Sequence, residues 1–225
     1  MTAPNTSKAA LWNEIQKQLS LLSAQAPGLK AKATVPKLYE IFVLSCVARA
    51  LRSIGATLIA KDSKDAPTAT LRFRLAPGLI YSPTTAPSFI EISRNKKKYE
   101  LHGGLRIKGR SGVLHELDVC VIDRKAAVKC RAKRMAPSNA HVKLLVECKF
   151  LGKPTFPLDL GREFIGLGAE FSLRIKTIVS NASNDEVHDL ITKHKSTENF
   201  LISAHPKGKL DLFVKWLANE LRQVL

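Results

Sequence analysis

The fold is decided by two short apolar stretches that carry charges in their middle, VKLLVECKF at residues 142–150 and VLHELDVCVI at residues 113–122. Each has the length and composition of a buried β-strand. Because strand side chains alternate between faces, Glu147 and Lys149 share one face of the first strand. Unpaired charge inside an apolar sheet is costly, so these groups and Asp118 must meet one another, a metal ion or water in a cleft. We expect the two strands to be neighbours, with Asp118 beside Glu147.

Helices and further strands surround these stretches. Apolar residues at helical spacing predict an amphipathic helix at 8–25 and a largely buried helix at 37–54. Residues 56–88 are expected to form a long loop with a strand near 70–75. The remaining expected elements are a strand from Phe89, strands at 99–107, 174–180 and 199–203, a basic loop at 124–139, and helices at 158–171, 184–195 and 209–224. This order predicts an α/β fold with a mixed central sheet flanked by helices.

The chain has the length for one substantial core with an appendage. Pro27 and Gly28 follow the first helix and separate it from the rest. We therefore expect an N-terminal helical arm at 1–35 and a main domain at 36–225. The arm either docks on the main domain or serves as a dimerisation element.

The charge of the chain is strongly unbalanced. Lys and Arg total 36 against 19 Asp and Glu, which gives a formal net charge of +17. Such an excess favours a polyanionic partner, with nucleic acid first and an anionic membrane surface second, although positive charge can also simply keep a protein soluble.

The apolar stretches, the first residues and the cysteines of the sequence indicate where the protein is located, and they predict no membrane partner. No stretch reaches the roughly 18 apolar residues of a membrane span, and the first twenty residues lack the pattern of a signal peptide. The four cysteines have no CxxC spacing, so they are expected to be free thiols in a reducing compartment. We expect a cytoplasmic protein.

The three charged strand residues suit one kind of chemistry. Paired carboxylates are the ligands that Mg²⁺ prefers, with Mn²⁺ as a substitute, and such a metal ion promotes phosphodiester hydrolysis. A lysine two residues from a carboxylate can hold the attacking water or the phosphate oxygens as negative charge develops. The alternative is a structural ion pair across two strands, although a buried pair seldom offsets its desolvation.

Asp118, a spacer of 28 residues and then Glu147-Cys148-Lys149 resembles the PD-(D/E)XK nuclease superfamily, which includes restriction endonucleases and Holliday-junction resolvases. In that family the aspartate lies on one strand of a hairpin and the E-x-K lies on the next strand. Leu117 stands where the proline of the motif would be. The resemblance implies a restriction-endonuclease-like core of a helix, three strands, a helix and a strand, with Asp118, Glu147 and Lys149 as catalytic residues and the two carboxylates as metal ligands.

Three further residues are candidates for the site. The resemblance implies that Glu40, on the helix at 37–54, is a catalytic residue and metal ligand, whereas the macrodipole also favours a glutamate near a helix start. Arg162 lies where other members orient water or phosphate, and it could equally be a solvated arginine on a helix surface. Glu116 shares a strand face with Asp118 and could be its true partner.

Basic residues gather around the expected catalytic hairpin, with thirteen against four acidic residues between positions 94 and 134. Duplex DNA is the expected partner, because aromatic residues are too few here for stacking single strands. The glycines at 103, 104, 109 and 112 would let backbone approach phosphates, or would simply bend a twisted hairpin. The side chains expected to contact nucleic acid are Lys96, Lys97, Lys98, Arg106, Lys108, Arg110, Lys129, Arg131, Lys133, Arg134 and Arg162.

Together these features predict a metal-dependent endonuclease that hydrolyses DNA phosphodiester bonds, in restriction or defence. It would act as a homodimer or as the subunit of a larger complex, because one site cuts one strand. The alternative is a non-catalytic nucleic-acid-binding module with a degenerate nuclease fold. RNA remains open as the substrate.

Overall fold

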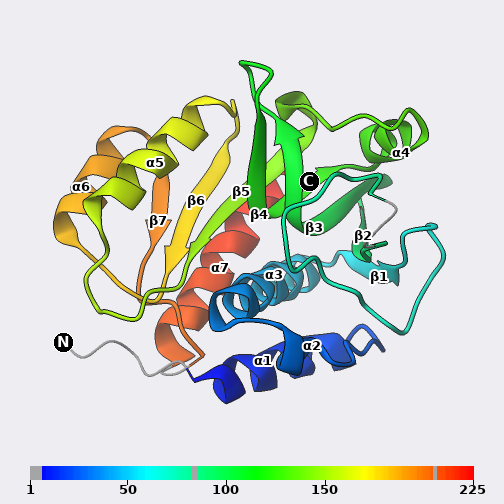
Figure 1. Ribbon diagram of the computed structural model, residues 1–225, viewed down its shortest axis with the longest axis horizontal. Helices are drawn as coiled ribbons and strands as arrows, with labels where there is room; N and C mark the ends of the chain where they lie inside the picture. The colour runs from blue at the N-terminus through cyan, green and yellow to red at the C-terminus, as the bar shows by residue number, and fades with distance from the viewer. Residues whose placement is uncertain (1–6, 83–85, 205–206) are drawn as a thin grey trace.

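A seven-stranded sheet lies between two layers of helices in the computed structural model, which describes residues 7–82, 86–204 and 207–225 (Figure 1). The strands lie in the sheet in chain order. They are β1 Thr57–Lys61, β2 Phe89–Arg94, β3 Lys97–Lys108, β4 Leu114–Asp123, β5 Val142–Lys149, β6 Ile175–Ser180 and β7 Thr197–Asn199. Neighbours from β1 to β5 are antiparallel, and β5, β6 and β7 are parallel. The predicted α/β class with a mixed sheet flanked by helices is confirmed.

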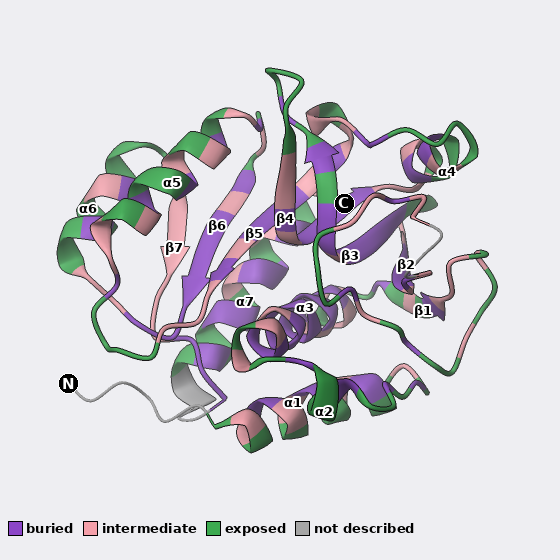
Figure 2. Cartoon of the chain, viewed as in Figure 1, coloured by how far each residue is buried: buried purple, intermediate pink, exposed green. Residues whose placement is uncertain are grey.

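The helices cover both faces of the sheet. They are α1 Lys8–Ser20, α2 Leu29–Lys32, α3 Val35–Ser53, α4 Arg124–Ala132, α5 Leu158–Ala169, α6 Asp185–Lys193 and α7 Lys207–Val224, with a 3₁₀ turn at Asn139–His141. One apolar core joins the sheet to α1, α3 and α7, and a second joins its other face to α4, α5 and α6. Figure 2 shows α3 buried along nearly its whole length.

The helix α3 owes its place to its sequence. The side chain of Thr34 caps it by accepting a hydrogen bond from the Lys37 N–H, and Pro36 fits the first turn, where no backbone donor is needed. Leu38, Phe42 and most of the helix are apolar and buried, so it can pack between the sheet and α1.

The arm predicted at 1–35 packs against this helix. Leu11, Ile15 and Leu19 of α1 are buried in the same core as α3. The first six residues of the predicted arm lie outside the described residues. Across the described ranges, no helix has the length and apolar character needed to cross a membrane.

Two of the expected elements are wrong. The strand lies at β1 and not near 70–75, because the backbone of that segment bonds outside the sheet: Leu71 N–H donates to the Gln25 carbonyl and Arg72 N–H to the Ser88 hydroxyl. The expected basic loop at 124–139 begins with α4, since Asp123 caps a helix there by accepting from the Ala126 N–H. The last strand also ends earlier than expected, at Asn199.

The sheet forks between β4 and β5, and this fork positions the candidate site. Pairing of these strands ends at Val119 opposite Val146; beyond it, β4 pairs with β3 and β5 pairs with β6. In Figure 1, β3 and β4 continue into a hairpin that projects from the top of the molecule. Asp118 and Glu147 are the first residues past the last β4–β5 pair.

The β3–β4 hairpin also changes face at this point. Gly104, opposite Asp118, has a φ of 59°, a left-handed conformation that favours glycine. Val119 lies in the core beside α3, whereas Leu105 and Leu117 lie in the core on the opposite face. Strict alternation would put all three on one face, so the strand pair twists at the Gly104–Asp118 step.

Candidate active site

The centre of the site is Asp118, which is held from across the fork. Its Oδ2 accepts a hydrogen bond of 2.8 Å from the Cys148 backbone N–H of β5. On β5, the Lys149 Nζ lies 2.9 Å from the Glu147 Oε1. The three charged groups predicted from the two strands are therefore brought together.

The helix α3 adds Glu40 to this cluster. The Glu40 carboxylate forms an ion pair with Lys37 one turn earlier, and both side chains are largely buried. Glu116, two residues before Asp118 on β4, also lies close enough to interact with its charge. Lys37 is not among the residues predicted from the sequence, although its i, i+3 spacing to Glu40 would have allowed that pair to be expected. We call Asp118, Glu147, Glu40, Glu116, Lys149 and Lys37 the fork cluster.

Burial and mutual repulsion raise the carboxyl pKa values in the fork cluster. Burial and the Asp118 charge raise the pKa of Glu40 to about 7 and that of Glu147 to about 7, against the pull of Lys37 and Lys149. Burial also raises the pKa of Asp118, although the Cys148 N–H and Lys149 oppose the rise. The cluster contains four carboxyl groups and only two lysines, so ionising all the carboxyl groups would leave an excess of negative charge. A bound cation would offset that excess and favour the ionised carboxylates.

Lys149 stays positively charged in this setting. Burial alone would lower the pKa of Lys149, but the charges of Glu147, Asp118 and Glu163 raise it above its usual value. A fixed ammonium group beside carboxylates can hold an anionic oxygen, such as one of a phosphate.

The donor set of the fork cluster fits a hard divalent cation. Its possible ligands are all carboxylate oxygens, the type that Mg²⁺ and Mn²⁺ accept. In the present side-chain arrangement, no three His, Cys, Asp or Glu groups among the described residues converge on a metal position. Instead, Glu40 forms an ion pair with Lys37, and Glu147 forms one with Lys149. Each glutamate would have to leave its lysine in order to hold an ion together with Asp118.

Arg74 is a further buried residue next to the site, and it is not among the residues predicted from the sequence. Its side chain is only 5% exposed, and its Nη1 donates a 3.2 Å hydrogen bond to the Gly103 carbonyl, beside the Gly104 step. Its Nε has no partner within the described chain, and burial lowers the pKa of Arg74 to about 10. The available signal was weak, because the segment LRFRL at 71–75 carries two arginines, Arg72 and Arg74, between apolar residues.

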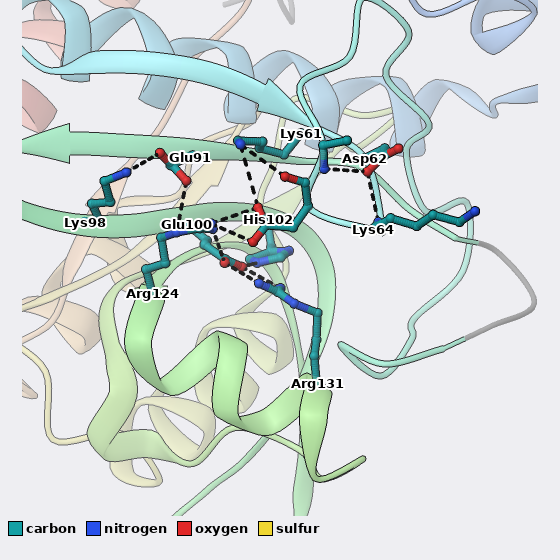
Figure 3. Close-up of polar contacts among 11 residues, drawn as sticks. Lys61, Asp62, Lys64, Glu91, Lys98, Glu100, His102, Arg124 and Arg131 are labelled. Atoms are coloured by element: carbon teal, nitrogen blue, oxygen red, sulfur yellow. Dashed lines mark hydrogen bonds and ion pairs between the residues drawn. The ribbon is translucent and has the colours of Figure 1, made fainter.

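Some of the expected nucleic-acid contacts are engaged in ion pairs within the protein. Lys98 Nζ lies 3.0 Å from the Glu91 Oε1. Arg131 of α4 donates hydrogen bonds to both carboxylate oxygens of the buried Glu100. Arg124 also donates a hydrogen bond to this carboxylate (Figure 3). These side chains fix α4 and β2 to β3, so Lys98 and Arg131 serve the fold in this arrangement.

The other basic candidates are exposed and fall into separate groups. Arg106, Lys108 and Arg110 follow one another along the projecting hairpin, and Arg106 lies opposite Glu116. The remaining exposed side chains are Lys96 and Lys97 at the β2–β3 turn, Lys129, Lys133 and Arg134 at and after the end of α4, and Arg162 on α5. Only the hairpin group continues directly from the fork cluster.

Comparison with known proteins identifies no relative: no protein-family model, no curated protein and no solved structure matches the chain.

Proposed function

We propose that this protein is a Mg²⁺-dependent endonuclease of the PD-(D/E)XK kind that hydrolyses DNA phosphodiester bonds. The observation that carries the proposal is the fork, which gathers Asp118, Glu147, Lys149 and Glu40 from two strands and one helix. The elements α3, β3, β4, β5, α5 and β6 occur in the order that the resemblance implies, with β1, β2 and α4 as additional elements between them, and this order supports the proposal. The net charge of +17 supports a polyanionic substrate.

The residues of the cluster have distinct roles in this mechanism. Asp118 is held in place by the Cys148 N–H and, with Glu147 and Glu40, would hold the metal ion. When bound, Mg²⁺ supplies Lewis acidity and lowers the pKa of a coordinated water. If Glu147 turned from Lys149 to hold the ion, the Lys149 ammonium would be free to donate to a phosphate oxygen or to the attacking water.

Plasmid cleavage tests the proposal. Purified protein should nick supercoiled DNA with Mg²⁺ or Mn²⁺ and should stop when EDTA is added. Asp118→Asn and Lys149→Ala should each reduce the cleavage rate by at least 100-fold, because removing one group that stabilises developing charge costs about that much. DNA binding in EDTA should change little. The proposal fails if both folded variants cut like the wild type.

A second function is a non-catalytic nucleic-acid-binding module. The ion pairs Lys37–Glu40 and Lys149–Glu147 favour it, since they already provide each glutamate with a partner. It predicts salt-sensitive DNA binding without cleavage under Mg²⁺, Mn²⁺ or Co²⁺. The plasmid assay therefore separates the two functions.

The proposal also includes the cellular compartment and the oligomeric state of the protein. The four cysteines are all free and buried, which favours a reducing compartment such as the cytoplasm. One site cuts one strand, so double-strand cleavage calls for a homodimer or a larger complex. Sedimentation of the protein with and without a DNA duplex would distinguish these assemblies.

A further inference from the structure

The β3–β4 hairpin beyond the fork carries three basic side chains, of which Arg106 lies opposite Glu116 and interacts with its charge. Arg106, Lys108 and Arg110 are exposed, and among the described residues none of them forms an ion pair. Alternate residues of this strand, Leu105 and Ile107, are buried in the core beside α4 and α5. Arg106 and Lys108 therefore lie on the side of the hairpin away from that core, and Arg110 follows in the exposed turn.

The spacing of these side chains suits a phosphate backbone. Residues two apart on a strand are about 6.6 Å apart, which is the expected separation of Arg106 and Lys108 on β3, and Arg110 follows in the turn after β3 ends. One strand of B-DNA carries a phosphate about every 3.4 Å of helix axis, so Arg106 and Lys108 are about two phosphates apart.

The tip of the hairpin is held rigidly by one residue. Glu170, at the end of α5, accepts hydrogen bonds on Oε2 from the Ser111 N–H at 2.9 Å and from the Ser111 hydroxyl at 2.7 Å. The Glu170 carbonyl accepts from the Arg110 N–H at 3.0 Å. A side chain at Gly109 would collide with the Glu170 carboxylate and with the His115 ring, so both would have to shift from the positions that they take here.

Two exposed apolar residues lie at the same tip. Val113 is 58% exposed and Leu114 is 43% exposed, and Figure 2 shows the tip as an exposed loop at the top of the molecule. Large apolar side chains beside cations suit a groove of duplex DNA, where they contact sugars and bases while the cations contact phosphates.

We propose that residues 106–114 form a fixed arm that holds the phosphate backbone of duplex DNA and leads it away from the fork cluster. This inference rests on the proposed function, which places the scissile phosphodiester at the fork. It assigns no such role to Lys96 and Lys97, which lie at the opposite end of β3, about 23 Å of extended chain from Gly104.

A pair of charge-matched variants tests the arm. Binding of a 24-base-pair DNA duplex is measured by fluorescence anisotropy in EDTA, from 50 to 300 mM KCl. Lys108→Gln/Arg110→Gln should weaken binding at least tenfold at 150 mM and lower the salt slope by about 2, since each lost phosphate contact removes about 0.9. The control, Lys96→Gln/Lys97→Gln, removes the same charge and should keep the wild-type slope.

Variants of Glu170 test the fixed position of the arm. Glu170→Ala should weaken duplex binding several-fold, whereas Glu170→Gln, which keeps an oxygen to accept from Ser111, should retain most of it. Loss of the same size in both charge-matched variants, or no loss in the arm variant, would overturn the inference, as would tighter binding of an RNA duplex.

Because binding in EDTA needs no catalysis, the two proposals fail separately. A wild-type protein that never cuts, but whose arm variant loses binding, overturns the nuclease and keeps the arm. If the wild-type protein cuts DNA but the arm variant binds it normally, the arm is overturned and the nuclease is kept.

Discussion

At the scale of single residues, the fork cluster depends on a side chain that is not one of its members. Asp118 points into the fork because β3 and β4 twist at the Gly104 step, and Arg74 ties that step by donating to the Gly103 carbonyl. We therefore regard Arg74 as a positioning residue. Removing its guanidinium leaves a carbonyl without its donor and a cavity beside the twist.

Arg74→Met should destabilise the protein by roughly 1–3 kcal/mol, the usual consequence of an unsatisfied buried polar group. It should also raise the Mg²⁺ concentration needed for half-maximal cleavage, because Asp118 is no longer held toward its partners. Binding of DNA in EDTA should stay at the wild-type level. Arg72→Met, at an exposed neighbouring position, is the control, and an unchanged Mg²⁺ requirement in Arg74→Met would refute the positioning role.

The sequence could predict the residues whose chemistry is conspicuous. Asp118, Glu147 and Lys149 were identifiable because each interrupts an apolar strand, and the alternation of strand side chains placed the last two on one face. Arg74 was missed because its partner is set by tertiary structure: it reaches the carbonyl of a residue 29 positions away. Lys37 was missed although its pair with Glu40 is local, since the two residues are three positions apart on one helix.

At the scale of elements, α4 shows how a local signal can be hidden by charge. Its many Lys and Arg residues suggested a loop, yet Asp123 caps it and Ala127 and Cys130 bury its inner face. Arg131 and Arg124 then bind Glu100 on β3, and Arg131 also lies 4.8 Å from the centre of the Phe89 ring. The helix is docked by ion pairs that the sequence pattern does not encode.

This docking should make stability depend on acid pH. Burial alone would raise the pKa of Glu100, but hydrogen bonds from Arg131 and His102 outweigh it and hold the pKa at about 2, below its ordinary 4.5. The unfolded state therefore binds the proton more readily, so stability from Glu100 is complete above about pH 4.5 and is lost as the pH falls toward 2.

Urea unfolding at pH 3, 4, 5 and 6 measures this dependence. The wild type should lose free energy of unfolding between pH 5 and 3 more steeply than Glu100→Gln, whose amide cannot ionise. Glu186→Gln, at an exposed position on α6, should follow the wild type. Parallel curves for the wild type and Glu100→Gln would show that the ion pairs contribute no net stability.

At the scale of the whole molecule, the fork cluster lies where the sheet divides into two halves, between β4 and β5. The fold class, its layers and most of its helices and strands could be predicted from the spacing of apolar residues. This is because the long helices and the central strands bury apolar faces whose residues recur at helical or strand spacing in the sequence. The fork did not follow from this spacing, because strand divergence depends on a left-handed glycine and on pairing between distant segments. Those two features turn separate strand charges into one cluster.

If that cluster holds a divalent ion, the ion should stabilise the whole fold. A ligand that binds the folded state alone adds about 2.7 kcal/mol at 100 times its Kd. For a chain of this size, that corresponds to a rise in Tm of roughly 5–10 °C. Scanning calorimetry with Mg²⁺ or Mn²⁺ should show the rise for wild type and for Glu186→Gln, and should lose it in Asp118→Asn and Glu147→Gln. Since Asp118 and Glu147 stand on opposite sides of the fork, loss in both variants would indicate that the ion bridges the two halves of the sheet. An equal rise in all four proteins would place metal binding elsewhere on the surface and leave the fork cluster as a set of ion pairs.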